Sequence, residues 1–186
     1  MGQVTNKVTP DENETKYIYD KVGNIRYSQN AAQAVSGDFL VYYYDQHNRL
    51  IQTGEEKDDY NWYTTPPDIA NTSYGTEAGE WKINYYYDEN FVTGVANYCW
   101  AKLTKTEVNS DNDNDPEHIT KYVYDKFGNM LEKRIEIDGG NPISEKLISH
   151  SYDQLGRETE LVYPSGNTVL RQFDAVGRLK KVYTVQ

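Results

Sequence analysis

The chain has 186 residues, a formal net charge of −10 and one cysteine, Cys99. An acidic chain suits neither nucleic acid nor an anionic membrane surface, because both bind clustered lysine and arginine. One cysteine excludes an internal disulfide and a cysteine-rich metal site. No apolar run approaches the roughly 20 residues that cross a bilayer, so we expect no membrane insertion.

Tyrosine is the most unusual part of the composition. The chain has 18 Tyr, 3 Trp and 4 Phe, which make up 13% of its residues. Tyrosine favours β-strands because its ring packs on a pleated surface while its hydroxyl reaches water. The low mean hydropathy, −0.86, argues against a thick hydrophobic core. The composition therefore predicts thin β-structure with at least one wet face.

Six segments of the chain align on an aspartate that follows an aromatic residue. In chain order these pairs are Tyr19-Asp20, Tyr44-Asp45, Tyr87-Asp88, Tyr124-Asp125, Tyr152-Asp153 and Phe173-Asp174. In four segments a second aromatic lies two residues earlier, at Tyr17, Tyr42, Tyr85 and Tyr122. This spacing places both rings on one face of a β-strand, and it does not place them together on a helix.

The third residue after the aspartate predicts a tight turn. It is a glycine in four segments, at Gly23, Gly128, Gly156 and Gly177. Aspartate at the start of a turn bonds downstream main-chain amides, and glycine at the fourth position accepts a positive φ. Asn48 takes that position in the second segment, and asparagine tolerates the same conformation. We therefore expect hairpins closed by a type I turn and a left-handed residue.

The third segment departs from this pattern. It reads Asp88-Glu89-Asn90-Phe91, and a phenylalanine is unsuited to a positive φ. We expect a longer turn there, which ends at Gly94.

The strands are clearest in the last third of the chain. They are expected at 119–124, 130–137, 143–152, 169–173 and 179–185, with a further turn at Pro164–Asn167. Short turns make consecutive strands antiparallel neighbours. The sequence thus predicts an all-β antiparallel hairpin meander, or partial β-sheet spiral, of about a dozen strands. We expect a single repeat domain over 1–186, with insertions at about 55–79 and 109–117 and a short helical turn at 30–37.

The motifs resemble the YD-repeat, or RHS-repeat, family of large secreted bacterial proteins. The residues that carry this resemblance are Tyr19–Asn24, Tyr124–Asn129, Tyr152–Arg157, Tyr163–Asn167 and Phe173–Leu179. The resemblance implies an extracellular or cell-surface polypeptide whose hairpins coil into a long sheet. In the large members that sheet is a shell around a toxic C-terminal segment, and the repeats have been linked to carbohydrate binding.

One part of the family pattern has no counterpart here. The core region that follows the repeats, with its self-cleaving aspartate site, is missing from this sequence. The resemblance therefore implies a non-catalytic scaffold or shell-wall segment. Its expected partners are neighbouring repeats or domains of the parent polypeptide.

Four aromatic residues lie in or beside the longest insertion, outside the repeat. They are Trp62, Tyr63, Tyr74 and Trp81. Large rings on a loop either stack on a sugar or cover an exposed face or edge of the sheet. The covering role is favoured, and a carbohydrate-binding or adhesion module is the alternative function. We expect Trp100 to be in the core, and the repeat tyrosines and aspartates to be structural rather than a ladder of sugar contacts.

Catalytic and metal sites find little support in the sequence. His47, His118 and His150 have no serine- or cysteine-centred motif beside them, and Cys99 has the surroundings of a small buried residue. Asp111, Asp113 and Asp115 alternate as in a calcium loop, but Pro116 and Tyr122 stand where an EF-hand has glycine and glutamate. We expect no enzyme activity, no metal and no cofactor.

Overall fold

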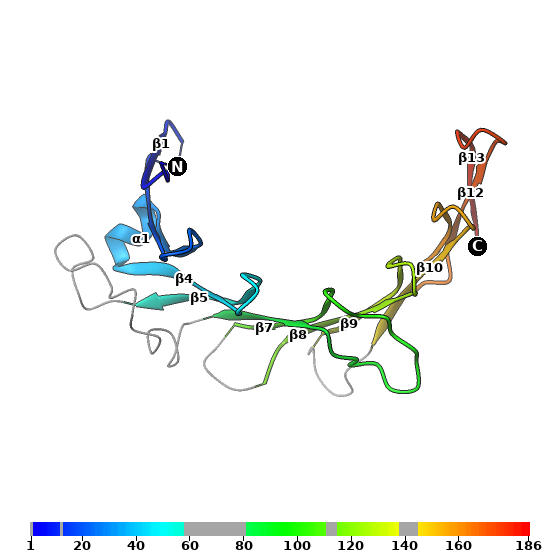
Figure 1. Ribbon diagram of the computed structural model, residues 1–186, viewed down its shortest axis with the longest axis horizontal. Coiled ribbons are helices and arrows are strands. Elements are labelled where there is room, and N and C mark those ends of the chain that lie inside the picture. The colour runs from blue at the N-terminus through cyan, green and yellow to red at the C-terminus, as the bar shows by residue number, and fades with distance from the viewer. Residues whose placement is uncertain (1, 12, 58–80, 111–114, 138–144) are drawn as a thin grey trace. The chain divides into compact units, whose positions relative to one another are not determined.

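The computed structural model describes residues 2–11, 13–57, 81–110, 115–137 and 145–186 (Figure 1). Its strands are β1 (Asn6–Thr9), β2 (Asn13–Tyr19), β3 (Ile25–Gln29), β4 (Asp38–Tyr44), β5 (Leu50–Lys57), β6 (Lys82–Tyr87), β7 (Leu103–Asn109), β8 (His118–Tyr124), β9 (Met130–Ile137), β10 (Lys146–Tyr152), β11 (Glu158–Val162), β12 (Thr168–Phe173) and β13 (Leu179–Val185). A helix, α1 (Ala31–Ser36), lies between β3 and β4.

The thirteen strands lie side by side in the order in which they occur along the chain. This arrangement confirms the predicted all-β antiparallel meander. The expected strand at 143–152 begins in the structure at Lys146, and residues 143–144 lie outside the described part. No helix in the described ranges is long and apolar enough to cross a membrane.

The chain divides into two compact units. Unit 1 comprises residues 1–84 and 108–115, and unit 2 comprises residues 85–107 and 116–186.

Unit 1 has a small aromatic core on its sheet. Tyr27, Phe39 and Val41 are buried, and Ile18 and Tyr43 pack against them. The rings of Tyr27 and Phe39 meet edge to face with 5.8 Å between centroids. This is one of the preferred arrangements of two aromatic rings. Burial, together with the neighbouring Tyr27, raises the pKa of Tyr43 to about 12.

The predicted helical turn is present as α1. The side chain of Asn30 accepts a hydrogen bond of 2.8 Å from the Gln33 amide, and the Gln33 side chain accepts one of 3.0 Å from the Asn30 amide. This reciprocal pair is a capping box, which satisfies two main-chain donors at the start of a helix. Gly37 ends the helix in the left-handed conformation, with φ 83°.

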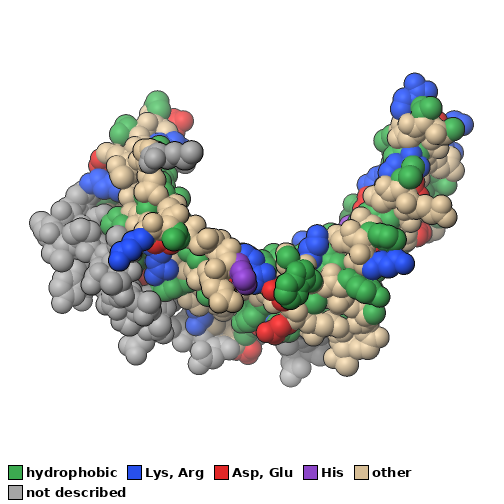
Figure 2. All heavy atoms as spheres, in the orientation of Figure 1, with side chains coloured by type: hydrophobic (Ala, Val, Ile, Leu, Met, Phe, Trp, Pro, Cys, Tyr) green, Lys and Arg blue, Asp and Glu red, His purple; other side chains and the backbone are tan. Residues whose placement is uncertain are grey.

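Unit 2 has far less core. Val92 and Val123 are the buried hydrophobic residues among its described positions. No described residue from Met130 to Gln186 is buried. Ion pairs form on the sheet instead: Lys121 of β8 pairs with Glu136 of β9 at 2.5 Å, and Arg134 pairs with Glu132 along β9 at 2.8 Å. On the face drawn in Figure 2, lysine and arginine side chains lie beside hydrophobic ones. This part of the chain is a single layer held by strand pairing and cross-strand side-chain contacts.

Five hairpins have one extra residue in their return strand. In β2–β3, Tyr19 pairs with Ile25 and Ile18 pairs with Tyr27, so Arg26 has no residue opposite it. The corresponding extra residues in β4–β5, β8–β9, β10–β11 and β12–β13 are Ile51, Leu131, Thr159 and Lys180. Such a β-bulge increases the right-handed twist of a strand pair. This bulge was not predicted from the sequence.

The repeat turns and the other connections lie at opposite ends of the strands. In a meander, alternate connections are at alternate ends. Within unit 2, the turns after β8, β10 and β12 therefore lie along one side of the sheet, where those strands end, and the turn of residues 163–167 lies along the opposite side. The side that carries the turns after β8, β10 and β12 is called the turn edge. Of the expected insertions, residues 58–79 and 111–114 lie outside the described residues.

Candidate functional site

The repeat aspartates hold their own turns. In the turn after β10, Asp153 Oδ1 accepts hydrogen bonds from the amides of Leu155 (2.9 Å) and Arg157 (3.0 Å). Its Oδ2 accepts a bond of 2.6 Å from Arg157 Nε. The side chain and amide of Arg157 hold the pKa of Asp153 below its ordinary value. Gly156 has φ 73°, as its place in the turn requires.

The same arrangement recurs at Asp20, Asp45, Asp125 and Asp174. Their second carboxylate oxygen accepts from Asn24, Arg49, Asn129 or Arg178. The left-handed residues are Gly23, Asn48, Gly128 and Gly177, with φ 101°, 60°, 87° and 88°. Because both oxygens of each carboxylate are engaged within the turn, this geometry supports a structural role.

The repeat tyrosines connect neighbouring hairpins. The hydroxyl of Tyr152 in β10 donates a bond of 2.9 Å to the carbonyl oxygen of Met130, where β9 begins. The Tyr124 hydroxyl in β8 likewise donates to the carbonyl oxygen of Leu103 in β7, at 2.8 Å. The composition predicted hydroxyls that reach water. These two instead satisfy main-chain acceptors of the preceding hairpin.

The residue that follows each left-handed position lies against the next turn. In unit 1, the side chain of Asn24 donates a bond of 3.1 Å to that of Asn48. In unit 2, a Cβ added at Gly177 would lie 3.1 Å from Arg157 Nη1, and one added at Gly128 would lie 3.1 Å from Lys102 Nζ. Successive turns within each unit are therefore in contact.

The third turn is longer than predicted. The Asp88 amide donates to the Lys102 carbonyl oxygen at 3.2 Å, so the hairpin closes at Lys102 rather than at Gly94. The reason lies in contacts of the intervening loop with β8. Asn97 Oδ1 accepts from the Tyr124 amide at 2.9 Å, and the Tyr98 amide donates to the Tyr124 carbonyl oxygen at 3.1 Å. The loop thus satisfies the main chain at the end of β8.

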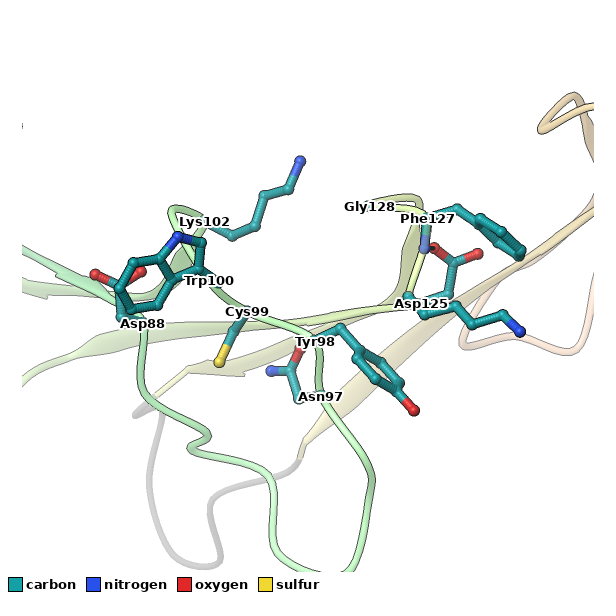
Figure 3. A pocket seen from close by; sticks show the side chains of 10 residues that line it. Asp88, Asn97, Tyr98, Cys99, Trp100, Lys102, Asp125, Phe127 and Gly128 are labelled. Atoms are coloured by element: carbon teal, nitrogen blue, oxygen red, sulfur yellow. Dashed lines mark hydrogen bonds between the residues drawn. The ribbon is translucent and has the colours of Figure 1, made fainter.

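The end of this loop and the turn after β8 border a shallow depression of about 650 Å³ (Figure 3). Trp100 lies on its rim and is 87% exposed, so the prediction that it is a core residue is wrong. Tyr98 and Phe127 also line the depression and are 58% and 79% exposed. Cys99, expected to be buried, is half-buried. The site was not predicted because the stretch Tyr98-Cys99-Trp100 is aromatic and apolar, and such a stretch indicates buried residues.

The four aromatic residues in or beside the longest insertion, candidates either to cover the sheet or to stack on a sugar, are largely untested. Trp62, Tyr63 and Tyr74 lie outside the described residues. Trp81 precedes β6 and is half-buried, and its carbonyl oxygen accepts a bond of 3.2 Å from the Glu55 amide. Asp111 and Asp113 of the calcium-like pattern also lie outside the described residues, and Asp115 is exposed.

The histidine with the most elaborate surroundings is His150 in β10. Its Nδ1 lies 2.6 Å from Glu158 Oε1, and Glu158 also forms an ion pair with Arg171. These three residues lie on adjacent strands β10, β11 and β12. The arrangement is a cross-strand charge cluster, which stabilises sheet pairing.

Comparisons with known proteins bear on the fold. No family model matches the chain, and no curated protein matches it. Among solved structures, it is similar to a crystal structure of TcdB2-TccC3-TEV, with a TM-score of 0.64 and 12% identity over 98% of this chain. Matches also include the Photorhabdus luminescens Tc holotoxin pore (TM-score 0.48, 14% identity, 96% of this chain) and TcdB2-TccC3 (0.40, 12%, 100%).

The identity is low, so the likeness to TcdB2-TccC3-TEV shows a shared fold. This chain spans 8% of the length of that chain. It spans 10% and 11% of the other two.

Proposed function

We propose that this chain is a structural repeat segment, a scaffold or shell wall, of a secreted or cell-surface RHS/YD-repeat protein. The observation that carries the proposal is the use of the repeated residues. Five of the six repeat aspartates are bonded within their own turns, and Tyr124 and Tyr152 bond the preceding hairpin. Residues used in this way join the turns and hairpins into a continuous sheet, which is what a scaffold requires.

Two further findings support this proposal. The motifs resemble YD repeats, and the fold is shared with part of a much longer chain, TcdB2-TccC3-TEV. Unit 2 is also a single layer with little core, and solenoid-like sheets of this kind gain stability from their neighbours. Neighbouring repeats or domains of the parent polypeptide are the partners that this reading requires.

The test is to find the parent polypeptide and its location. An antibody raised against the purified chain would be used on blots of cells, culture medium and protease-treated cells from the source organism. We expect a band much larger than 21.5 kDa, in the medium or removed from intact cells by added protease. A band of the chain's own size that protease cannot reach would overturn the proposal.

A carbohydrate-binding or adhesion module is the second candidate, favoured by one observation. Trp100 is 87% exposed beside a depression that Lys102 and Lys126 also line. An exposed ring next to polar side chains suits a sugar, which presents both C–H and hydroxyl groups. A glycan array with the native chain, Trp100→Ala and a Trp62→Ala/Trp81→Ala double variant would test it. Binding lost in either variant would locate the site, and a blank array would remove this candidate.

A further inference from the structure

The regular turns of unit 2 expose one apolar side chain each, at the second residue after the aspartate. These residues are Phe127, Leu155 and Val176, which are 79%, 76% and 74% exposed. We call them the tip row. Each belongs to a different hairpin, and all three hairpins turn at the same edge of the sheet. A single exposed apolar residue is ordinary, but a repeated one along an edge marks an interaction surface.

Exposed positive side chains flank the tip row. Lys126 and Lys180 are exposed, and the Arg178 side chain is 81% exposed. The carboxylates of Asp125, Asp153 and Asp174 are directed into their own turns by hydrogen bonds. In a chain with a net charge of −10, Lys126 and Lys180 therefore place positive charge beside an apolar row, while Arg178 is paired with Asp174. A partner with carboxylates complements it, whereas the acidic character of the chain as a whole would repel one.

The spacing of the row fits an extended chain that runs across the tips. Successive hairpins are two strands apart, which is about 10 Å. Three residues of a polyproline-II segment rise about 9.3 Å and return to the same side. Between two of the tips lies a depression of about 720 Å³, lined by Phe127, Leu131, Tyr152 and Leu155. It offers a partly apolar site for a side chain that is presented every third residue.

We propose that the tip row docks an extended segment of another protein, with an apolar side chain at every third residue and carboxylates between them. The segment lies across the turns after β8, β10 and β12. Apolar side chains contact Phe127, Leu155 and Val176, and the carboxylates face Lys126 and Lys180. This interaction goes beyond the scaffold role, because it uses the exposed turns and not the contacts that join one hairpin to the next.

The probe is a fluorescein-labelled peptide of Leu-Pro-Glu repeats, in which proline keeps the chain extended and prevents a helix. Ser-Pro-Glu and Leu-Pro-Lys peptides of equal length are the controls. Fluorescence anisotropy would be measured with the full chain at low and high salt. We expect saturable binding of Leu-Pro-Glu alone, weakened by salt.

Phe127→Ser and Leu155→Ser should each weaken that binding about tenfold, because each removes a large apolar contact. Val35→Ser is the matched control, since Val35 is 90% exposed but lies in α1. Circular dichroism and melting curves would show that all three variants fold as the native chain does.

Three results would overturn the proposal. The Leu-Pro-Glu peptide does not bind, or the Ser-Pro-Glu peptide binds equally well, which would indicate charge attraction alone. The third is self-association in sedimentation velocity that Phe127→Ser abolishes, because the tip row would then contact a second copy. None of these results bears on the scaffold proposal, which is tested by the size and location of the parent polypeptide.

Discussion

The hydroxyl of Tyr152 donates a hydrogen bond of 2.9 Å to the carbonyl oxygen of Met130, the first residue of the preceding return strand. Tyr124 bonds Leu103 in the same way. The conspicuous tyrosine of the repeat thus acts between hairpins, while the aspartate beside it acts within one. Two adjacent residues of one motif therefore perform two structural tasks.

Removal of the Tyr152 hydroxyl should destabilise the sheet. Tyr152→Phe keeps the ring but leaves the Met130 carbonyl oxygen without this donor, at a cost of about 1 kcal/mol. Tyr98→Phe is the control, because Tyr98 is 58% exposed. Urea unfolding should give a lower midpoint for Tyr152→Phe and an unchanged one for Tyr98→Phe. Equal midpoints for both would show that the inter-hairpin bond contributes nothing.

Glycine should be needed at the left-handed turn position because of the positive φ there, and not because a side chain would lack space. Gly156 has φ 73°, and a Cβ there would lie 3.6 Å from Asn129 Oδ1, an ordinary contact. Gly156→Ala therefore isolates the conformational cost, about 1 kcal/mol. Asn48→Gly at the equivalent position, φ 60°, should change the free energy of unfolding by less than about half as much. A neutral Gly156→Ala would contradict the turn assignment.

Acid should weaken the turns. The side chain and amide of Arg157 lower the pKa of Asp153, and the amide and side chain of Arg178 lower that of Asp174. The unfolded chain then takes up protons first as the pH falls. The contribution to stability is complete above the ordinary aspartate pKa of about 3.9 and is lost as the pH falls through the lower folded value.

Melting temperatures from about pH 6 to about pH 2 would measure this loss. The melting temperature of a variant with Asp153→Asn and Asp174→Asn should decrease less steeply with falling pH than that of the native chain. Identical slopes would show that these two carboxylates do not couple proton uptake to unfolding.

The two units should respond differently to the loss of a valine. Val41 is 2% exposed, and Val41→Ala should cost about 2 kcal/mol through lost burial and a cavity. Val169 in β12 is half-buried, so Val169→Ala should cost less than half of that. Chemical unfolding of both variants would compare the two. A larger loss at Val169 would mean that the layer of unit 2 is covered in solution.

Much of the fold could be predicted because its signals are local. Asn48 marked a left-handed position without a glycine, since its own backbone preference is enough, and the structure gives it φ 60°. The alternation of aromatic residues before each aspartate predicted strands whose ends the structure reproduces closely, as at β8 (His118–Tyr124). Turn chemistry and strand period need only a few neighbouring residues.

What could not be predicted depends on distant partners. The loop 89–101 continues past Gly94 because Asn97 and Tyr98 bond the main chain of Tyr124, 27 and 26 positions away in the sequence. That docking leaves Trp100 exposed, although its neighbours in sequence are apolar. The bulge at Arg26 was missed for a similar reason. An extra residue is visible only when two strands are paired.

The extra residue in each bulge has a consequence for how a repeat chain of this kind can lengthen during evolution. Each of the five bulged hairpins sets its own register just after the turn, and the links that Tyr124 and Tyr152 make to the hairpin before them lie at that same end. The length of the connection at the far end then has no effect on which side chains face which way. Gene duplication could add or remove one hairpin without disturbing the next. Insertions could accumulate at the far end during evolution at little cost to the rest.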